Sequence, residues 1–187
     1  MALTILVIRH AEKPDETWPG PGLTDHGIED DKSLVIRGWQ RAGAWASLFG
    51  AGLGGGADYP VPDTIYAAQP GDGRVDHGPS RRPAETISAL ALRLGLTANE
   101  TFAKGQEDAL VTQLVTLSGV VLICWEHNAI VADIIPKVPL SQGTPPTRWP
   151  GDRYDVVLRF DRPTGTTKFR FQALYPRLLS GDLNTPL

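Results

Sequence analysis

Two histidines stand directly after the two most apolar stretches of the chain. His10 follows Arg9 at the end of the apolar run 3–8, and His127 follows the apolar run 119–125. A guanidinium can hold an anion through several N–H donors, and a neighbouring imidazole can attack it. An Arg-His pair alone is often no more than a solvated turn. The second copy of the same arrangement favours one site shared by both histidines.

A third junction supplies two further arginines. Arg81 and Arg82 follow an apolar segment at 63–68 and stand at the start of a predicted helix over 81–94, for which Ser80 is a good N-cap and Pro83 fits the first turn. The N-terminus of a helix favours an anion, which an arginine would reinforce. Both arginines could also simply face water, and Arg82 is the better candidate for a pocket.

Together these junctions supply four groups suited to a phosphoryl dianion. Guanidiniums offer planar forks of donors to the non-bridging oxygens, and the imidazoles can hydrogen-bond the same group while one of them attacks phosphorus. The four residues are Arg9, His10, Arg82 and His127.

The elements that must position these residues alternate between strand and helix. Apolar runs predict strands at 3–8, 63–68 and 119–125, and helical spacing predicts helices at 35–49, 81–94, 106–117 and 129–135. This order predicts an α/β fold, a three-layer α/β/α sandwich around a mostly parallel sheet. Alternating residues at 154–160 and 168–175 predict a C-terminal antiparallel hairpin at one sheet edge. We expect a single domain over residues 1–187.

The composition narrows the possible partners and surroundings. A net charge of −3 argues against nucleic-acid binding, and no apolar run approaches the length of a membrane span. Cys124 is the one cysteine and falls inside a predicted strand, where a buried, inert thiol is expected. No signal peptide is recognisable, so we expect a cytoplasmic protein. A glycine-rich run at 50–56 follows a helix, which predicts a flexible connection and no phosphate loop.

Four segments in order resemble the histidine phosphatase (phosphoglycerate mutase-like) superfamily. RHAEK at 9–13 is similar to its RHGE motif, and LVIRGWQRAGAWA at 34–46 is similar to its LTxxGxxQA helix. SRRPAETISAL at 80–90 resembles the segment with the second phosphate-binding arginine, and VVLICWEHNAI at 120–130 resembles the strand that ends in the second histidine. The resemblance spans most of residues 3–135 and implies a phosphoglycerate mutase-like fold.

The resemblance also implies a mechanism that needs no metal and no cofactor. His10 would attack the phosphoryl group and form a phosphohistidine that water hydrolyses, with its other ring nitrogen donating to a backbone carbonyl. Arg9, Arg82 and His127 would hold the oxygens, with His127 protonated. The expected substrate is a phosphorylated small molecule or a phosphoprotein, and a phosphate or sulfate ion is expected to occupy the pocket.

The general acid for the leaving oxygen is less well marked. Glu107 stands where one branch of the family has its acid, between the second arginine and the second histidine, with Asp108 and Glu100 as rivals. The acid-phosphatase branch has an aspartate directly after the second histidine, but here that residue is Asn128, whose amide donates no useful proton. Glu107 could equally be an ordinary acidic residue in the first turn of a helix.

Other functions remain open at this point. A mutase needs a second anion-binding group, for which the sequence shows no obvious basic cluster. A catalytically silent phosphate-binding module would not need the full set of four residues, and a metal hydrolase would need a third ligand besides His10 and His127. Loops at 14–33, 69–79 and 141–152 carry no motif that identifies the substrate.

Overall fold

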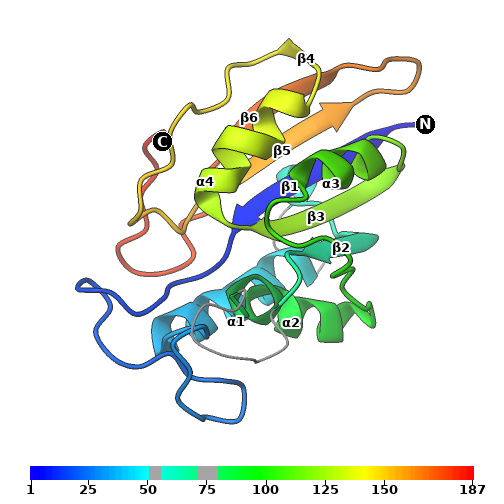
Figure 1. Ribbon diagram of the computed structural model, residues 1–187. Coiled ribbons are helices and arrows are strands. Elements are labelled where there is room, and N and C mark those ends of the chain that lie inside the picture. The colour runs from blue at the N-terminus through cyan, green and yellow to red at the C-terminus, as the bar shows by residue number, and fades with distance from the viewer. Residues whose placement is uncertain (51–55, 71–79) are drawn as a thin grey trace.

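A six-stranded mixed sheet lies between two layers of helices in the computed structural model, which describes residues 1–50, 56–70 and 80–187 (Figure 1). The strands run in the order β2-β3-β1-β5-β6-β4. Their bounds are β1 (Leu3–Arg9), β2 (Thr64–Ala67), β3 (Gly119–Trp125), β4 (Leu140–Gln142), β5 (Val157–Arg162) and β6 (Phe169–Leu174). The α/β sandwich predicted from the sequence is therefore confirmed.

The helices divide between the two faces of the sheet. In Figure 1, α1 (Ile36–Gly50) and α2 (Arg82–Leu94) lie below the sheet, and α3 (Glu107–Leu114) and α4 (His127–Ala129) lie above it. A short 3-10 turn, η1, covers Gly56–Asp58. Across the described ranges, no helix combines the length and the apolarity that crossing a membrane requires.

The helix predicted at 129–135 differs from the one observed. It begins at His127 as α4, passes into a π-helix, η2 (Ile130–Ile134), and ends in a 3-10 turn, η3 (Ile135–Lys137). Pro136 lies in that last turn. The helix ends there because a proline has no backbone N–H to donate to the next helical hydrogen bond. The π-helix adds one residue per turn and carries no signal in the apolar spacing.

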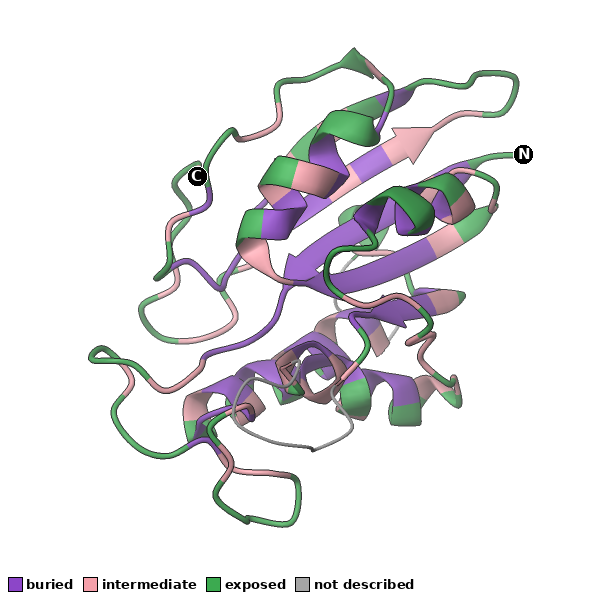
Figure 2. Ribbon diagram, viewed as in Figure 1, coloured by how far each residue is buried: buried purple, intermediate pink, exposed green. Residues whose placement is uncertain are grey.

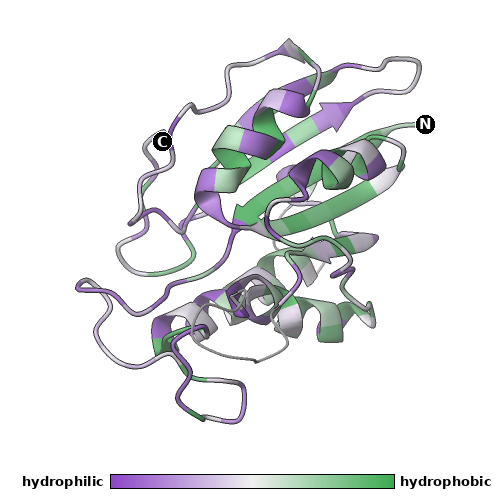
Figure 3. Cartoon of the chain, viewed as in Figure 1, coloured by the Kyte–Doolittle hydropathy of each residue, from purple (hydrophilic) through white to green (hydrophobic). Residues whose placement is uncertain are grey.

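Burial explains why the central strands are apolar without alternation. Figure 2 shows β1 and β3 buried along most of their length, and Figure 3 shows the same strands as the most hydrophobic part of the sheet. Alternate residues enter two cores: Ile123 packs toward α3 and η2, while Leu6 and Cys124 pack toward α1 and α2. Burial also raises the pKa of the Cys124 thiol, which agrees with the inert role predicted for it.

The C-terminal hairpin is present, but its predicted place at the sheet edge is wrong. β5 pairs antiparallel with β1, β6 pairs antiparallel with β5, and β4 lies outside both, parallel to β6. β4 is a three-residue strand that overlaps the start of the segment predicted as a loop at 141–152, and it has no buried residue and no alternating pattern. Its pairing is therefore set by the chain around it and has no local sequence signal.

The carboxyl ends of three parallel strands meet at one edge. Arg9 on β1 pairs with Trp125 on β3, and Ala67 on β2 pairs with Cys124. The ladder continues one step further, because the backbone N–H of His10 donates to the carbonyl of Trp125 at 2.9 Å. The register thus brings the residues that follow β1, β2 and β3 to the same place, which is where ligands bind in open α/β sheets.

A buried ion-pair chain ties the C-terminal segment to the end of β1. Arg41 on α1 lies 2.8 Å from a carboxylate oxygen of Glu12 and 2.8 Å from one of Asp182. Burial alone would raise the pKa of Asp182, but the hydrogen bond and charge of Arg41, together with backbone N–H groups of Leu178 and Leu179, outweigh it and lower that pKa. The last residues are held further by Asp155, which accepts the backbone N–H of Leu183 at 2.6 Å.

Candidate active site

A pocket of about 460 Å³ opens where the carboxyl ends of β1, β2 and β3 meet. It brings together three of the predicted residues from distant parts of the chain, and three lysines line it as well. The three predicted residues and three lysines are His10, Arg82, His127, Lys13, Lys32 and Lys104.

His10 is held in one tautomer. Its Nδ1 lies 2.8 Å from the carbonyl oxygen of Ala11, and because a carbonyl only accepts, Nδ1 must carry the proton. Nε2 then keeps its lone pair. Burial lowers the pKa of His10 to about 3, and the positive charges of Arg9 and Arg82 act in the same direction. The imidazole is therefore neutral at neutral pH, as a nucleophile must be.

Arg9 lies buried directly beside His10 and does not itself line the pocket. Its Nη1 donates to the carbonyls of Gly151 and Arg153, each at 2.9 Å, and to that of Pro150 at 3.3 Å. Within the described residues, its Nε and Nη2 are buried and have no hydrogen-bond partner. Burial lowers the pKa of Arg9, but the ordinary value is so high that the guanidinium stays charged.

Arg82 lines the pocket at the first residue of α2. Its Nε donates to the carbonyl of Ser33 at 3.1 Å, and its Nη2 donates to that of Asp31. The predicted loop at 14–33 thus reaches the site through its last residues. Arg81, by contrast, faces outward and pairs with Asp30 at 3.1 Å, with nearly half of its side chain exposed.

The start of α2 is capped differently from the sequence-based prediction. The structure places the N-cap at Arg81, and Ser80 accepts the backbone N–H of Arg82 at 3.2 Å from one residue earlier. Thr86 then links this helix to the residues that follow β1: its hydroxyl accepts the N–H of Ala11 at 2.8 Å and donates to the carbonyl of Arg82 at 2.6 Å. One buried hydroxyl therefore connects the backbone next to His10 with the backbone of Arg82.

His127 enters the pocket from the first turn of α4. Its Nδ1 lies 2.8 Å from Oε1 of Glu126, a short contact that is not aligned as a hydrogen bond. Glu126 caps this turn by accepting the N–H groups of Asn128 and Ala129. Burial opposes ionisation of Glu126, but His127 and these N–H groups outweigh it and lower its pKa, and Lys104 lies 3.2 Å away. Glu126 is therefore a fixed negative charge beside His127.

Glu107, the expected general acid, is not brought to the pocket. Its carboxylate is buried at the start of α3, where it accepts the indole N–H of Trp125 at 2.8 Å and the backbone N–H of Gly105 at 2.9 Å. Both oxygens are thus used inside the protein. Glu107 therefore has a structural role in the first turn of α3, which was the alternative to its being the general acid. Trp125 belongs to the core.

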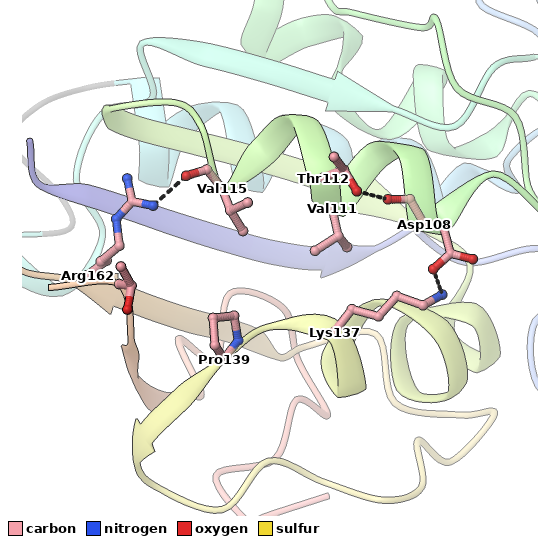
Figure 4. Close-up of a pocket in the computed structure, with 8 residues that line it drawn as sticks. Asp108, Val111, Thr112, Val115, Lys137, Pro139 and Arg162 are labelled. Carbon is pink, nitrogen blue, oxygen red and sulfur yellow. Dashed lines mark hydrogen bonds and ion pairs between the residues drawn. The ribbon is translucent and has the colours of Figure 1, made fainter.

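The two rivals for that role lie in other cavities. Asp108 is exposed, pairs with Lys137 at 2.9 Å and lines a cavity between α3 and the segment that leads into β4 (Figure 4). Glu100 lines a third cavity beside α2, and burial raises its pKa. Neither carboxylate is among the groups around His10.

Two features of the site were missed from the sequence. The lysines of the pocket come from two loops, Lys13 and Lys32 from the connection between β1 and α1 and Lys104 from that between α2 and α3, and they form a cluster only in the folded chain. The segment 150–154 clasps Arg9 mainly through backbone carbonyls, which leave no trace in residue type. His26 is solvated as expected. His77 lies in the 71–79 segment, which is outside the described residues, as is the 51–55 segment. Most of the predicted loop at 69–79 and of the predicted connection at 50–56 therefore also lies outside them.

Within residues 1–50, 56–70 and 80–187, no group of three or more His, Cys, Asp or Glu side chains could hold a metal ion. His10 and His127 therefore have no third protein ligand there of the kind that a zinc site uses.

Comparison with solved structures shows what this fold is similar to. The protein histidine phosphatase SixA, solved with tungstate, covers 92% of this chain and 97% of its own length, with a TM-score of 0.57 and 11% identity. This likeness shows a histidine-phosphatase-like fold.

Two mycobacterial structures also align over most of the chain. A glucosyl-3-phosphoglycerate phosphatase, Rv2419c, is 15% identical and covers 94% of this chain and 98% of its own, and mycobacterial hydrolase 2 is 14% identical and covers 92% and 89%. Both have a TM-score of 0.48. No protein-family model matches the chain, and comparison with curated protein sequences gives no match.

Proposed function

We propose that this chain, with its histidine-phosphatase-like fold, is a phosphatase that hydrolyses phosphomonoesters through a phosphohistidine on His10, without a metal. The observation that carries the proposal is the state of His10: a neutral imidazole with Nδ1 bound to a carbonyl, in a pocket that Arg82 and His127 also line. A neutral imidazole held in one tautomer among cations is suited to attack an anion and has no evident structural purpose.

The reaction has two displacements. The lone pair on Nε2 of His10 attacks phosphorus, and the bond from phosphorus to the leaving oxygen breaks, so that the leaving group departs with the bonding electron pair and takes a proton from solvent. Water then attacks the phosphohistidine and gives up a proton to solvent, the P–N bond breaks with its electron pair returning to Nε2, and inorganic phosphate leaves. Arg9, Arg82 and His127 stabilise the charge on the non-bridging oxygens in both steps.

The ionised state of Glu126 favours substrates whose leaving group needs little help from an acid. Because its pKa is lowered, Glu126 is a poor proton donor at neutral pH. A phenolate leaves readily from an aryl phosphate, and an imidazole leaves as the neutral molecule from a phosphohistidine whose ring is protonated. A protein-bound phosphohistidine, the substrate class in the name of SixA, is therefore our second candidate beside phosphomonoesters.

A mutase and a silent phosphate-binding module are the alternatives to hydrolysis. The lysines at 13, 32 and 104 are a basic cluster of the kind that a mutase substrate with two anionic groups would use. The two enzymes differ in the fate of phosphorus, which ³¹P NMR follows directly. A phosphatase gives inorganic phosphate, a mutase gives an isomeric phosphoester, and a silent module gives no change.

Replacement of His10 tests the proposal. We expect His10→Ala to abolish release of inorganic phosphate from an aryl phosphate, while His26→Ala, a change at an exposed histidine, retains parental activity. The parent protein, quenched in turnover, should carry an acid-labile phosphoryl group that His10→Ala lacks. EDTA should leave the rate unchanged. Activity retained by His10→Ala, or lost with EDTA and restored by zinc or magnesium, would contradict the proposed mechanism.

A further inference from the structure

The loop before β5 holds Arg9 from two sides. Three of its carbonyls accept from Nη1 of Arg9, and the aromatic ring of Tyr154 stacks on the guanidinium, with Cζ 3.8 Å from the ring centroid. The loop is itself braced, because the indole N–H of Trp149 donates to the carbonyl of Arg153 at 2.8 Å. The position of Tyr154 relative to Arg9 is therefore well defined.

Tyr154 also lies next to the other groups of the site. Its ring centroid is 6.2 Å from that of His10. The positive charges of both Arg9 and Arg82 act on its phenol, which therefore lies near both guanidiniums. Tyr154 thus contacts Arg9 and lies near His10 and Arg82, and like Arg9 it stands behind the residues that line the pocket.

The hydroxyl of Tyr154 is an unusual buried group. The residue is 2% exposed, and in the described part of the chain its hydroxyl has no hydrogen-bond partner. Buried hydroxyls are normally paired, because leaving one unpaired is costly. Nε and Nη2 of Arg9 share this condition, so two stacked side chains beside the nucleophile hold three buried donors without acceptors. A phosphoryl group offers oxygens that could accept from all of them.

We propose that the hydroxyl of Tyr154 is a further ligand of the phosphoryl group, donating to a non-bridging oxygen beside Arg9, in addition to the stacking that positions the guanidinium. The inference rests on the proposed function, since it assumes that an oxyanion binds at His10. Burial raises the pKa of Tyr154 above its ordinary value, so the phenol keeps its proton and remains a donor across the neutral range.

Tyr154→Phe isolates the hydroxyl, because phenylalanine keeps the ring that stacks on Arg9. The probe is tungstate, a tetrahedral oxyanion like phosphate, and its dissociation constant is measured by isothermal titration calorimetry. We expect the constant to rise about tenfold or more, the range for one hydrogen bond to a charged group. In thermal unfolding without tungstate, the variant should be at least as stable as the parent, because an unpaired buried hydroxyl is removed.

Tyr66→Phe is the matched control. Tyr66 is also buried, but it lies on β2 and its hydroxyl accepts from Nε2 of Gln113 at 3.1 Å, away from the pocket. It should lose some stability and bind tungstate as the parent does. If Tyr154→Phe binds tungstate within twofold of the parent, the ligand role is wrong and the proposed function stands. If the parent protein does not bind tungstate at all, both proposals are wrong.

Discussion

His10 stands among cations that attract an anion, and yet it remains uncharged itself. A histidine surrounded by cations is a strong candidate for binding an anion, yet the same cations and its burial keep it from becoming a cation itself. The hydrogen bond to the Ala11 carbonyl acts in the other direction and is outweighed. The surroundings of His10 therefore keep its imidazole neutral, and a pKa lowered this far in a pocket is typical of a functional group, here one whose Nε2 lone pair is available.

This environment predicts a pH dependence of stability. The pKa of His10 is lowered from 6.5 to about 3 in the folded protein. Between these values the unfolded chain binds a proton there and the folded chain does not, so the free energy of unfolding falls as pH falls, by at most about 1.4 kcal/mol per pH unit. Urea unfolding at pH 6.5 and pH 5 should show the parent losing up to about 2 kcal/mol more than His10→Asn.

Equal losses for the parent and His10→Asn over that range would mean that the imidazole is not kept neutral.

The same environment predicts that activity is not lost through protonation of free His10 until the pH approaches 3. An acid limb near pH 6 in kcat/KM therefore has to come from another group or from the substrate.

Glu107 gives a second prediction at this scale. Glu107→Gln should weaken the contacts to Trp125 and Gly105 and lower the free energy of unfolding by about 1–3 kcal/mol. It should slow aryl and alkyl phosphates by the same factor, because the carboxylate lies outside the pocket. Asp108→Asn, one residue further on and exposed, is the control for a change of charge alone. A selective slowing of the alkyl ester would restore Glu107 as the general acid.

At the scale of elements, the buried strands were the most predictable part of the fold. Runs of consecutive apolar residues predicted β1 and β3 closely, because both faces of these strands are covered and no alternation is needed. The π-helix at 130–134, the short β4 and the place of the hairpin were not predictable. The short β4 and the place of the hairpin depend on pairing with parts of the chain that are distant in sequence, and the π-helix has no signal in the apolar spacing.

The site could be predicted as far as its residues follow strands and start helices. His10, Arg82 and His127 stand at such junctions, and the strand register brings them together. The clasp around Arg9 could not be predicted, because backbone carbonyls of any residue type can form it. Tyr154 has one possible signal in the sequence. It is an aromatic residue just before β5, and β5 is the neighbour of β1, which ends in Arg9.

The link between β1 and α2 through Thr86 gives a prediction for these elements. Thr86→Val keeps the shape but leaves the N–H of Ala11 without its acceptor. We expect the free energy of unfolding to fall by about 1–3 kcal/mol. Because His10 bonds to the carbonyl of the same residue, kcat should also fall, by about tenfold or more. Thr112→Val, which removes a similar hydroxyl bond on α3, should leave kcat unchanged.

At the scale of the whole molecule, the charge of the pocket opposes that of the protein. The chain carries a net charge of −3, yet the pocket gathers three lysines and Arg82 around one carboxylate, Glu126. A local positive field at a cleft raises the encounter rate with anions, and salt weakens it. This arrangement favours substrates with negative charge beyond the phosphoryl group itself.

Lys13 tests this electrostatic role. Lys13→Gln should lower kcat/KM for a phosphopeptide with acidic flanks about three- to tenfold and should flatten its dependence on ionic strength. A small aryl phosphate should be affected less. Lys168→Gln, an exposed change before β6, should alter neither substrate. Equal effects on both substrates would assign Lys13 to the phosphoryl group alone.

The ion-pair chain from Glu12 through Arg41 to Asp182 makes the last stretch of the polypeptide a support for the segment that follows β1. A peptidase that trimmed the protein back to Leu178 would remove no group that lines the pocket, yet it would strip Arg41 of one of its two carboxylates. We therefore expect proteolysis of this tail to lower turnover during storage, with intact mass falling in step with activity.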